Sequence, residues 1–388
     1  MNTLLDGNQI TLLRNGGEYF PVLIAAIDNA QNEIYLQTYI FEPDVTGLKV
    51  GDALRQAATR GVQVYLLLDG FGCKGLSKTY VQDLKGAGVE VLFYRPKISP
   101  LTLNRGRLHR MHRKVTVIDG KVGFVGGINI IDDFDTPNTV SPRVDYALQV
   151  QGPLLASMRI SVRLLWRRLC WTAQHPLNAS KLQIHEIHQY QAPVGNMHAK
   201  FLVRDNLWHR RDIEDAYLTA IKAARVEIVI ANAYFLPGLR FRHALRDAAA
   251  RGVSVKLLLQ ARVEYVMLDL ASHALYSSLL RQGIEIYEYH KSFMHSKVAV
   301  IDEKWAIVGS SNIDPFSLLM SREANVEVLD IKFATELRQD LQKSIETGAS
   351  QVTTDEWQNN HYTKRFFSWL VYGLVRLMIG LAGYSDSH

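Results

Sequence analysis

The sequence predicts an α/β protein made of two similar domains, and two observations carry this prediction. Helix-forming stretches alternate with short β-branched and aromatic runs, a pattern typical of mainly parallel or mixed sheets covered by helices on both faces. The chain also repeats itself: ALRQAATRGVQVYLLL begins at residue 53, and ALRDAAARGVSVKLLL begins 191 residues later. We therefore expect two α/β/α domains related by pseudo-twofold symmetry.

Each copy of the repeat supplies a strand, a helix and two further strands, in that order. The first strands are IYLQTYIF at 34–41 and IVIANAYF at 228–235. Each helix that follows is rich in Ala, Leu and Arg and ends at a glycine, after which a short apolar strand begins. The third strands are AGVEVLFY at 87–94 and QGIEIYEY at 282–289.

Domain boundaries follow from the repeat. Residues 1–171 form the first expected domain and residues 196–350 the second. Residues 172–195, which contain HPLNAS and QAPVG, are the expected connection. Residues 355–388 are an apolar tail.

Composition describes a globular protein with an anionic partner. The 388 residues suffice for two domains with full cores, and 47% hydrophobic with 21% charged residues is ordinary for such a chain. The formal net charge of +6 favours nucleic acid, phosphorylated ligands or acidic lipid as partners. Cys73 and Cys170 are too few for a disulfide framework and lack metal-ligand spacing, so we expect buried, reduced thiols and no metal. The start, MNTLLDGNQI, has no secretory signal pattern.

A pattern of His, one residue, Lys, four residues and Asp occurs three times. Two copies, HRKVTVID and HSKVAVID, lie 183 residues apart at corresponding places of the repeat, and each continues into glycine and asparagine. Their members are His112, Lys114, Asp119 and Asn129 in the first copy, and His295, Lys297, Asp302, Ser310 and Asn312 in the second.

The third copy, His198, Lys200 and Asp205, has no glycine and no asparagine at the positions where the other two copies have them. It also precedes the first strand of the second repeat. We interpret it as a chance match on a strand at 197–205 that ends in a turn.

The spacing of the two full motifs suits phosphate chemistry. Alternate residues of a strand share a face, so each histidine and lysine point the same way. Glycine permits a tight turn that presents the asparagine beside them. Two such sets across a pseudo-twofold axis place a histidine on either side of one phosphorus, the geometry of in-line displacement. The aspartates fall at the strand ends, where we expect them to hold the loop.

The duplicated stretches resemble the paired HKD motifs of the phospholipase D superfamily, in particular its bacterial members that make cardiolipin. The similarity extends from about residue 8 to the tail. It implies cofactor-free, metal-independent phosphatidyl transfer through a covalent phosphohistidine. It counts Asp119 and Asp302 with the catalytic residues, makes His112 the nucleophile and makes His295 the acid and base, a choice that the sequence alone leaves open.

The resemblance also implies an acid downstream of each motif that orients its histidine. Asp145 lies 33 residues after His112, and Glu323 lies 28 residues after His295. The phosphate oxygens would be held by both motif lysines together with Asn129, Ser310 and Asn312.

The acceptor separates the possible activities. A second phosphatidylglycerol as acceptor gives cardiolipin and glycerol, whereas water gives phosphatidic acid. A nuclease remains an alternative, since basic residues could bind either kind of phosphate. Those near the first motif are Arg105, Arg107, His109, Arg110 and Arg113. An inactive scaffold is disfavoured because both motifs are intact.

The tail favours lipid. FFSWLVYGLVRLMIGLA at 366–382 is short for a membrane span and contains Arg376. A less apolar stripe recurs every four residues: Lys364, Ser368, Tyr372, Arg376 and Gly380. We expect a helix in the membrane interface, with docking on the protein's own core as the alternative. The chain is thus expected at the cytoplasmic face of a bacterial inner membrane, as a peripheral protein bound to phosphatidylglycerol and other anionic phospholipids. We expect no nucleic acid and infer no obligate protein partner.

Overall fold

The computed structural model describes residues 3–95, 109–134, 140–172, 192–205, 208–262, 266–354 and 362–379. The elements of the first half are β1 (Leu5–Arg14), α1 (Asn15–Asp28), β2 (Glu33–Thr38), α2 (Val45–Thr59), β3 (Gln63–Asp69), α3 (Lys78–Gly86), β4 (Glu90–Tyr94), β5 (Lys114–Ile118), β6 (Val122–Gly126), β7 (Val140–Val144), β8 (Tyr146–Gln151) and α4 (Leu154–Thr172).

The second half continues the same alternation. Its elements are β9 (Met197–Arg204), α5 (Asp212–Ala223), β10 (Glu227–Asn232), α6 (Leu239–Ala250), β11 (Ser254–Gln260), α7 (Val266–Arg281), β12 (Glu285–Tyr289), β13 (Ser292–Met294), β14 (Lys297–Ile301), β15 (Trp305–Gly309), α8 (Pro315–Met320), β16 (Glu323–Leu329), α9 (Ile331–Gly348), β17 (Ala349–Gln351) and α11 (Tyr362–Ile379).

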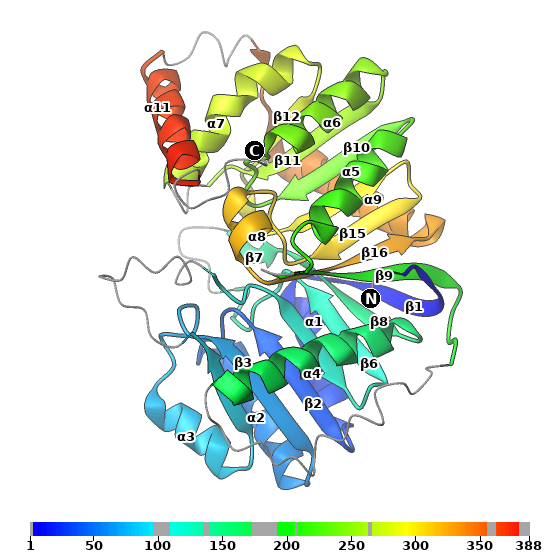
Figure 1. The fold of residues 1–388 in the computed structure, drawn as a ribbon, viewed down its shortest axis with the longest axis vertical. Coiled ribbons are helices and arrows are strands. Elements are labelled where there is room, and N and C mark those ends of the chain that lie inside the picture. The colour runs from blue at the N-terminus through cyan, green and yellow to red at the C-terminus, as the bar shows by residue number, and fades with distance from the viewer. Residues whose placement is uncertain are drawn as a thin grey trace.

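One mixed sheet runs through both halves of the molecule (Figure 1). From its centre outward, the first half has the order β1-β8-β6-β5-β2-β3-β4 and the second half has β9-β16-β15-β14-β10-β11-β12-β17. The halves join where β1 pairs antiparallel with β9. Strands β7 and β13, one from each half, form a separate parallel pair. The two halves therefore meet along their first strands and again at this small pair.

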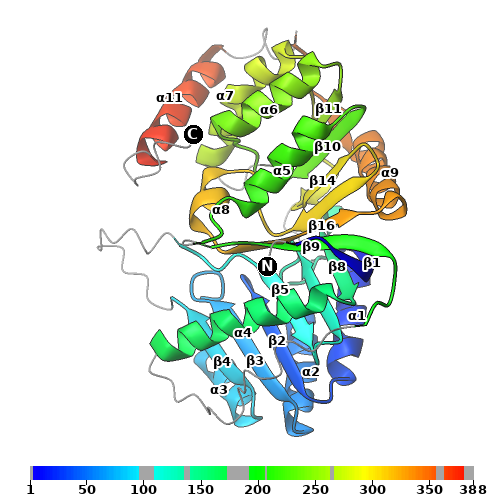
Figure 2. The ribbon, with the colours of Figure 1, turned by 45° about the vertical axis from the view of Figure 1, so that its right-hand side comes forward.

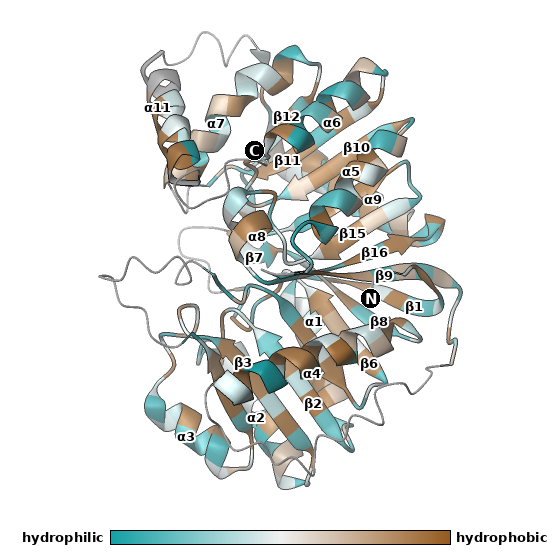
Figure 3. Cartoon of the chain, viewed as in Figure 1, coloured by the Kyte–Doolittle hydropathy of each residue, from teal (hydrophilic) through white to brown (hydrophobic). Residues whose placement is uncertain are grey.

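Helices cover both faces of the sheet (Figure 2). On one face, α4 and α9 pack on a core that is continuous between the halves. On the other, α1, α2 and α3 cover the first half, while α5, α6 and α7 cover the second, each over its own core. Figure 3 shows the strands as largely hydrophobic, as expected for a sheet buried on both sides.

The elements predicted from the repeat are present. Strands β2 and β10, helices α2 and α6, and strands β3, β11, β4 and β12 occupy the expected stretches. Gly61 and Gly252, which follow the two helices, have φ of +92° and +87°, the left-handed conformation that ends a helix at glycine. The stretch predicted as a strand at 197–205 is β9. Most of the expected connection at 172–195 lies outside the described residues.

Helix α11 packs along α7, as Figures 1 and 2 both show. The less apolar stripe of α11 does not simply face water, because part of it is buried against the protein. Ser368 is fully buried and Tyr372 packs against the core of the second half, whereas Arg376 of the same stripe is exposed. The exposed large apolar side chains of the helix are Phe367, Trp369, Leu370, Leu374 and Leu377. Among the described helices, none is long and apolar enough to cross a bilayer.

Both cysteines, Cys73 and Cys170, are buried free thiols, as the sequence predicts.

Candidate active site

The histidine and the asparagine of each full motif face one cavity of about 610 Å³. Each histidine precedes a central strand, β5 or β14, that is buried on both faces. The polar side chains that line the cavity are Tyr39, Arg110, His112, Asn129, Tyr234, His295, Asn312, Asp314, Ser317, Ser321 and Glu323. Ile40, Val266, Met267, Leu268 and Val375 supply an apolar part of its wall.

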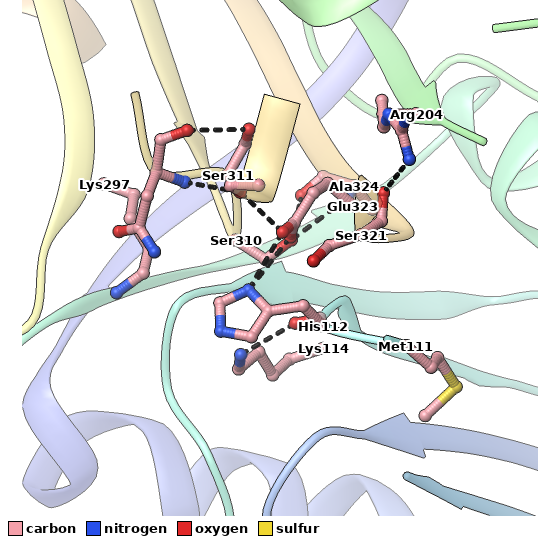
Figure 4. Close-up of polar contacts among 12 residues, drawn as sticks. Met111, His112, Lys114, Arg204, Lys297, Ser310, Ser311, Ser321, Glu323 and Ala324 are labelled. Atoms are coloured by element: carbon pink, nitrogen blue, oxygen red, sulfur yellow. Dashed lines mark hydrogen bonds and ion pairs between the residues drawn. The ribbon is translucent and has the colours of Figure 1, made fainter. Parts of the chain in front are cut away.

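Each histidine is paired with a carboxylate from the other half of the chain. Nδ1 of His112 lies 3.0 Å from Oε1 and 3.1 Å from Oε2 of Glu323 (Figure 4). Nδ1 of His295 lies 2.7 Å from Oδ2 of Asp145. The order along the sequence predicts that each acid orients the histidine of the motif before it. This prediction is wrong, because each acid binds the histidine of the other motif. With Nδ1 engaged by the acid, Nε2 is the ring nitrogen left for a substrate.

The backbone fixes this crossing. The His112 amide donates to the carbonyl of Arg322 at 3.0 Å, and the His295 amide donates to the carbonyl of Val144 at 2.8 Å. Each accepting residue directly precedes the acid that binds the same histidine's ring. Ring and main chain of each histidine are therefore both held by the opposite half.

Each motif lysine contacts the backbone of the histidine of its own motif. Nζ of Lys114 donates to the carbonyl of His112 at 2.7 Å, and Nζ of Lys297 donates to the carbonyl of His295. Burial and the nearby charge of Lys297 lower the pKa of Lys114 to about 7. The ring of Tyr39 lies against His112, with ring centroids 4.9 Å apart, and 5.3 Å from Nζ of Lys114.

The motif asparagines reach the cavity as expected. Oδ1 of Asn129 accepts from the amide of Ile40 at 3.2 Å, which leaves the side-chain NH₂ as a donor. The backbone amide of Asn312 donates to Oγ of Ser317 at 3.0 Å.

Ser310 was expected to contact phosphate, but it does not line the cavity. Its hydroxyl donates to Oε2 of Glu323 at 2.5 Å, and that of Ser317 donates to Oε1 at 2.6 Å. In the first half, Gly127 occupies the place of Ser310. A Cβ there would lie 2.2 Å from Oδ1 of Asp145, so the close approach of this carboxylate requires glycine.

The two acids therefore have different electrostatic surroundings. Burial would raise the pKa of Glu323, but His112, Lys114 and the Ser310 hydroxyl together hold it below its usual value. Asp145 has no such hydroxyl: Oδ1 accepts from the Tyr146 amide at 2.8 Å, and burial raises its pKa to about 7. Burial also lowers the pKa of His112 and of His295, and both lysines add to the effect at each ring. These shifts favour the neutral form of both rings.

The motif aspartates lie away from the cavity. Asp119 accepts from the amides of Gln31, Asn32 and Glu33 at 2.8, 2.8 and 2.9 Å. Asp302 repeats this with the amides at 225–227, at 2.8, 2.8 and 3.0 Å. Both aspartates have positive φ, 52° and 54°. They fasten the turn after β5 or β14 to the start of β2 or β10, so their assignment to the catalytic group by motif is not supported by the geometry.

The third motif match is not part of the cavity. His198 lies on β9 with its side chain 52% exposed, 3.6 Å from Asp6.

Sequence analysis missed Ser317 and Tyr39, which have no motif of their own. Tyr39 could have been identified from its position, because it directly follows β2, the strand that pairs with β5 of the first motif.

A mixed α/β sheet with two histidines, each bound to a carboxylate of the other half and facing one cavity, is typical of one class: enzymes of the phospholipase D superfamily, with phosphatidyl transfer as their reaction. Residues 23–135 and 217–345 match the family described as "Cardiolipin synthase, PLD-like domain". The chain belongs to this family.

Relatives extend the match to nearly the whole chain. Cardiolipin synthase B of Salmonella typhimurium is 38% identical over 384 residues, which is 99% of this chain and 91% of the relative. Cardiolipin synthase B of Escherichia coli K12 is 36% identical over 393 residues, with the same coverage. The fold is similar to that of phosphatidylserine synthase from Haemophilus influenzae, with a TM-score of 0.66 at 12% identity, covering 99% of this chain and 97% of that one.

The motif aspartates lead to a stability prediction. Asp302→Ala leaves three backbone N–H groups without their acceptor, so we expect the free energy of unfolding to fall by about 1–3 kcal/mol. Urea denaturation measures this loss, and turnover per folded molecule should stay within about threefold of wild type, because the side chain is remote from the cavity. A normal unfolding midpoint with abolished turnover would instead place Asp302 in the chemistry.

Proposed function

We propose that this protein transfers a phosphatidyl group from one phosphatidylglycerol to another through a phosphohistidine, releasing glycerol and forming cardiolipin. The observation that carries the proposal is the crossed pair of histidine–carboxylate contacts around a single cavity. In this proposal, residues 1–171 and 196–350 act as twofold-related domains that contribute one histidine each.

In the first half-reaction, Nε2 of His112 attacks phosphorus, and the bond from phosphorus to the glycerol oxygen breaks. His295, protonated when the anionic substrate enters, gives its proton to that oxygen. The motif lysines and the amides of Asn129 and Asn312 stabilise the charge on the non-bridging oxygens.

In the second half-reaction, neutral His295 takes the proton of the incoming hydroxyl. The hydroxyl oxygen bonds phosphorus as the phosphorus–nitrogen bond to His112 breaks, and the free enzyme returns. The same group thus acts first as acid and then as base, which histidine does well near neutral pH.

The surroundings of the two acids support His112 as the nucleophile. A phosphorylated imidazole is cationic, and an ionised carboxylate on Nδ1 stabilises it. Glu323 is the better-stabilised anion, because two serine hydroxyls donate to it. Asp145, with its raised pKa, suits a histidine that gains and loses a proton within each cycle.

The cavity wall favours lipid over nucleic acid. Val266, Met267, Leu268 and Val375 form an apolar side that acyl chains can contact, whereas a nuclease groove is lined by cations that follow the phosphate backbone. The exposed apolar face of α11 is on the element that supplies Val375. We propose that this face lies in the membrane interface and that the protein is peripheral to the cytoplasmic side of the inner membrane.

Substitution of the histidines tests the reaction. His112→Ala and His295→Ala should each lower cardiolipin formation by at least about 10³-fold, since each removes a nucleophile or an acid. His198→Ala is the matched control and should leave the rate near wild type. Product analysis with labelled phosphatidylglycerol separates cardiolipin from phosphatidic acid, and phosphatidic acid as the sole product would make the protein a hydrolase.

The pKa of Lys114 predicts a pH dependence. Its charged form binds phosphate, and because its pKa is lowered to about 7, the free enzyme loses that charge as pH rises through 7. We expect kcat/KM to fall above about pH 7, whereas kcat should fall only at higher pH, since bound phosphate raises the lysine pKa. Alkaline limbs at the same pH in both profiles would contradict this assignment.

The α11 face leads to a binding prediction. The triple change Phe367→Ser, Leu370→Ser and Leu374→Ser should weaken sedimentation with phosphatidylglycerol vesicles by at least about tenfold, because each large apolar side chain contributes roughly 1.5–3 kcal/mol when fully buried. Turnover of short-chain lipid dispersed in detergent should persist. The control is Val226→Ser with Ile331→Ser, two exposed apolar residues elsewhere. Equal loss of binding in both variants would refute α11 as the docking face.

A further inference from the structure

Arg110 is a charged group of the cavity wall that the reaction steps above do not use. It lies two residues before His112, and alternate residues of an extended chain point the same way, about 7 Å apart. Its backbone carbonyl accepts from the amide of Arg322 at 2.7 Å, so the main chain here is fixed by the opposite half.

The guanidinium is held by an aromatic ring. Its central carbon lies 5.1 Å from the centroid of Phe71, and Nζ of Lys74 lies 5.3 Å from the same centroid. Phe71 is 41% exposed, so this pair of cations lies at the rim of the cavity. Stacking of this kind orients an arginine and leaves its N–H donors available.

Among the described residues no acid forms an ion pair with Arg110, although the Asp69 carboxylate acts on it electrostatically. The nearest candidate, Asp69, is fully buried, and its carboxylate accepts from the amides of Phe71, Gly72 and Met111 at 2.9, 3.1 and 2.9 Å. Within the described part of the chain the guanidinium makes no hydrogen bond or ion pair, so its N–H donors can serve a ligand.

The second half has no cation at the corresponding sequence position, although the guanidinium of Arg143, from the first half, lies 5.4 Å from the ring that replaces it. Two residues before His295, the position of Arg110 is taken by Phe293, whose ring is parallel to that of His295. The reacting phosphate has two histidines, two lysines and two asparagines arranged in pairs. Arg110, which lies at the rim and has no counterpart in the other half, is not part of this paired set. It therefore suits a second, different phosphate.

We propose that Arg110 is the core of a second anion subsite that binds the phosphate of the acceptor phospholipid. The inference rests on the proposed function, because a hydrolase brings only one phosphate into the cavity. Arg110 holds the phosphodiester of the incoming lipid one glycerol unit from the reacting phosphorus. The terminal hydroxyl of that glycerol then bonds phosphorus as the bond to His112 breaks, and its proton passes to His295. Arg110 thereby selects an anionic lipid over water or a neutral alcohol as acceptor.

The test compares two acceptors in the same enzyme. Short-chain phosphatidylglycerol in a non-ionic detergent is incubated with labelled glycerol, and both cardiolipin and labelled phosphatidylglycerol are measured. Arg110→Gln should lower cardiolipin formation by at least about tenfold, the effect expected for one charge-assisted contact. Glycerol exchange should stay within about twofold, since glycerol carries no phosphate. Arg110→Lys should keep an intermediate ratio, and Arg246→Gln, an exposed arginine on α6 paired with Asp247, is the charge-matched control.

Equal loss of both products in folded Arg110→Gln would overturn the proposal, because Arg110 would then act on the reacting phosphate. No loss of either product would overturn it as well. If that variant does not fold, Phe71→Ala decides: it leaves the arginine but removes its ring, and an unchanged ratio of cardiolipin to exchange would refute the subsite. A wild-type protein that forms neither product is a different outcome, the failure of the proposed function itself.

Discussion

The structure depends on the two crossed histidine–carboxylate pairs. Glu323 is fully buried and Asp145 nearly so, and a buried carboxylate is costly unless it is paired and hydrogen-bonded. Each acid binds a histidine of the opposite half, 211 and 150 residues away along the chain. Separating the halves would leave both acids without their histidine and both histidines without an orienting group. The continuous sheet, joined at β1 and β9, and the core shared by α4 and α9 keep the halves in one arrangement.

The two halves contribute matching motif residues to the site, but the proposed reaction is asymmetric because nucleophile and acid have different tasks. The asymmetry comes from single positions. The hydroxyl of Ser310 donates to Glu323, whereas Gly127, at the corresponding position, has no side chain and lets Asp145 approach closely. Arg110 faces the cavity where the other half has Phe293. In the proposed mechanism the two halves supply one histidine each, and these differences between the halves favour different roles for the two histidines.

Sequence predicted those features that depend on local pattern. The repeat located the strands and helices, since their periodicity is set by neighbouring residues, and the spacing of the motifs placed His112 and Lys114 on one face. The crossing of Asp145 and Glu323 could not be predicted in this way, because it depends on the register between distant segments, such as Met111 beside Arg322. Ser310 was assigned to phosphate for the same reason: spacing puts it near the asparagine, but only the packing of β16 beside β15 shows that its hydroxyl meets Glu323.

In the C-terminal tail, the sequence pattern predicted a helix with two different faces but not which face packs on the protein. A stripe every four residues identifies two faces of a helix, but which face meets protein depends on α7, whose surface the pattern does not contain. Small Ser368 and the ring of Tyr372 allow close packing on α7, so the bulky apolar side chains point outward. That arrangement also bears on the choice of acceptor. An enzyme held at the membrane meets lipid hydroxyls at high effective concentration, and confinement to one surface favours them over water before any contact is made. A rim cation such as Arg110 then has only to distinguish anionic lipid from the other hydroxyls that reach the cavity.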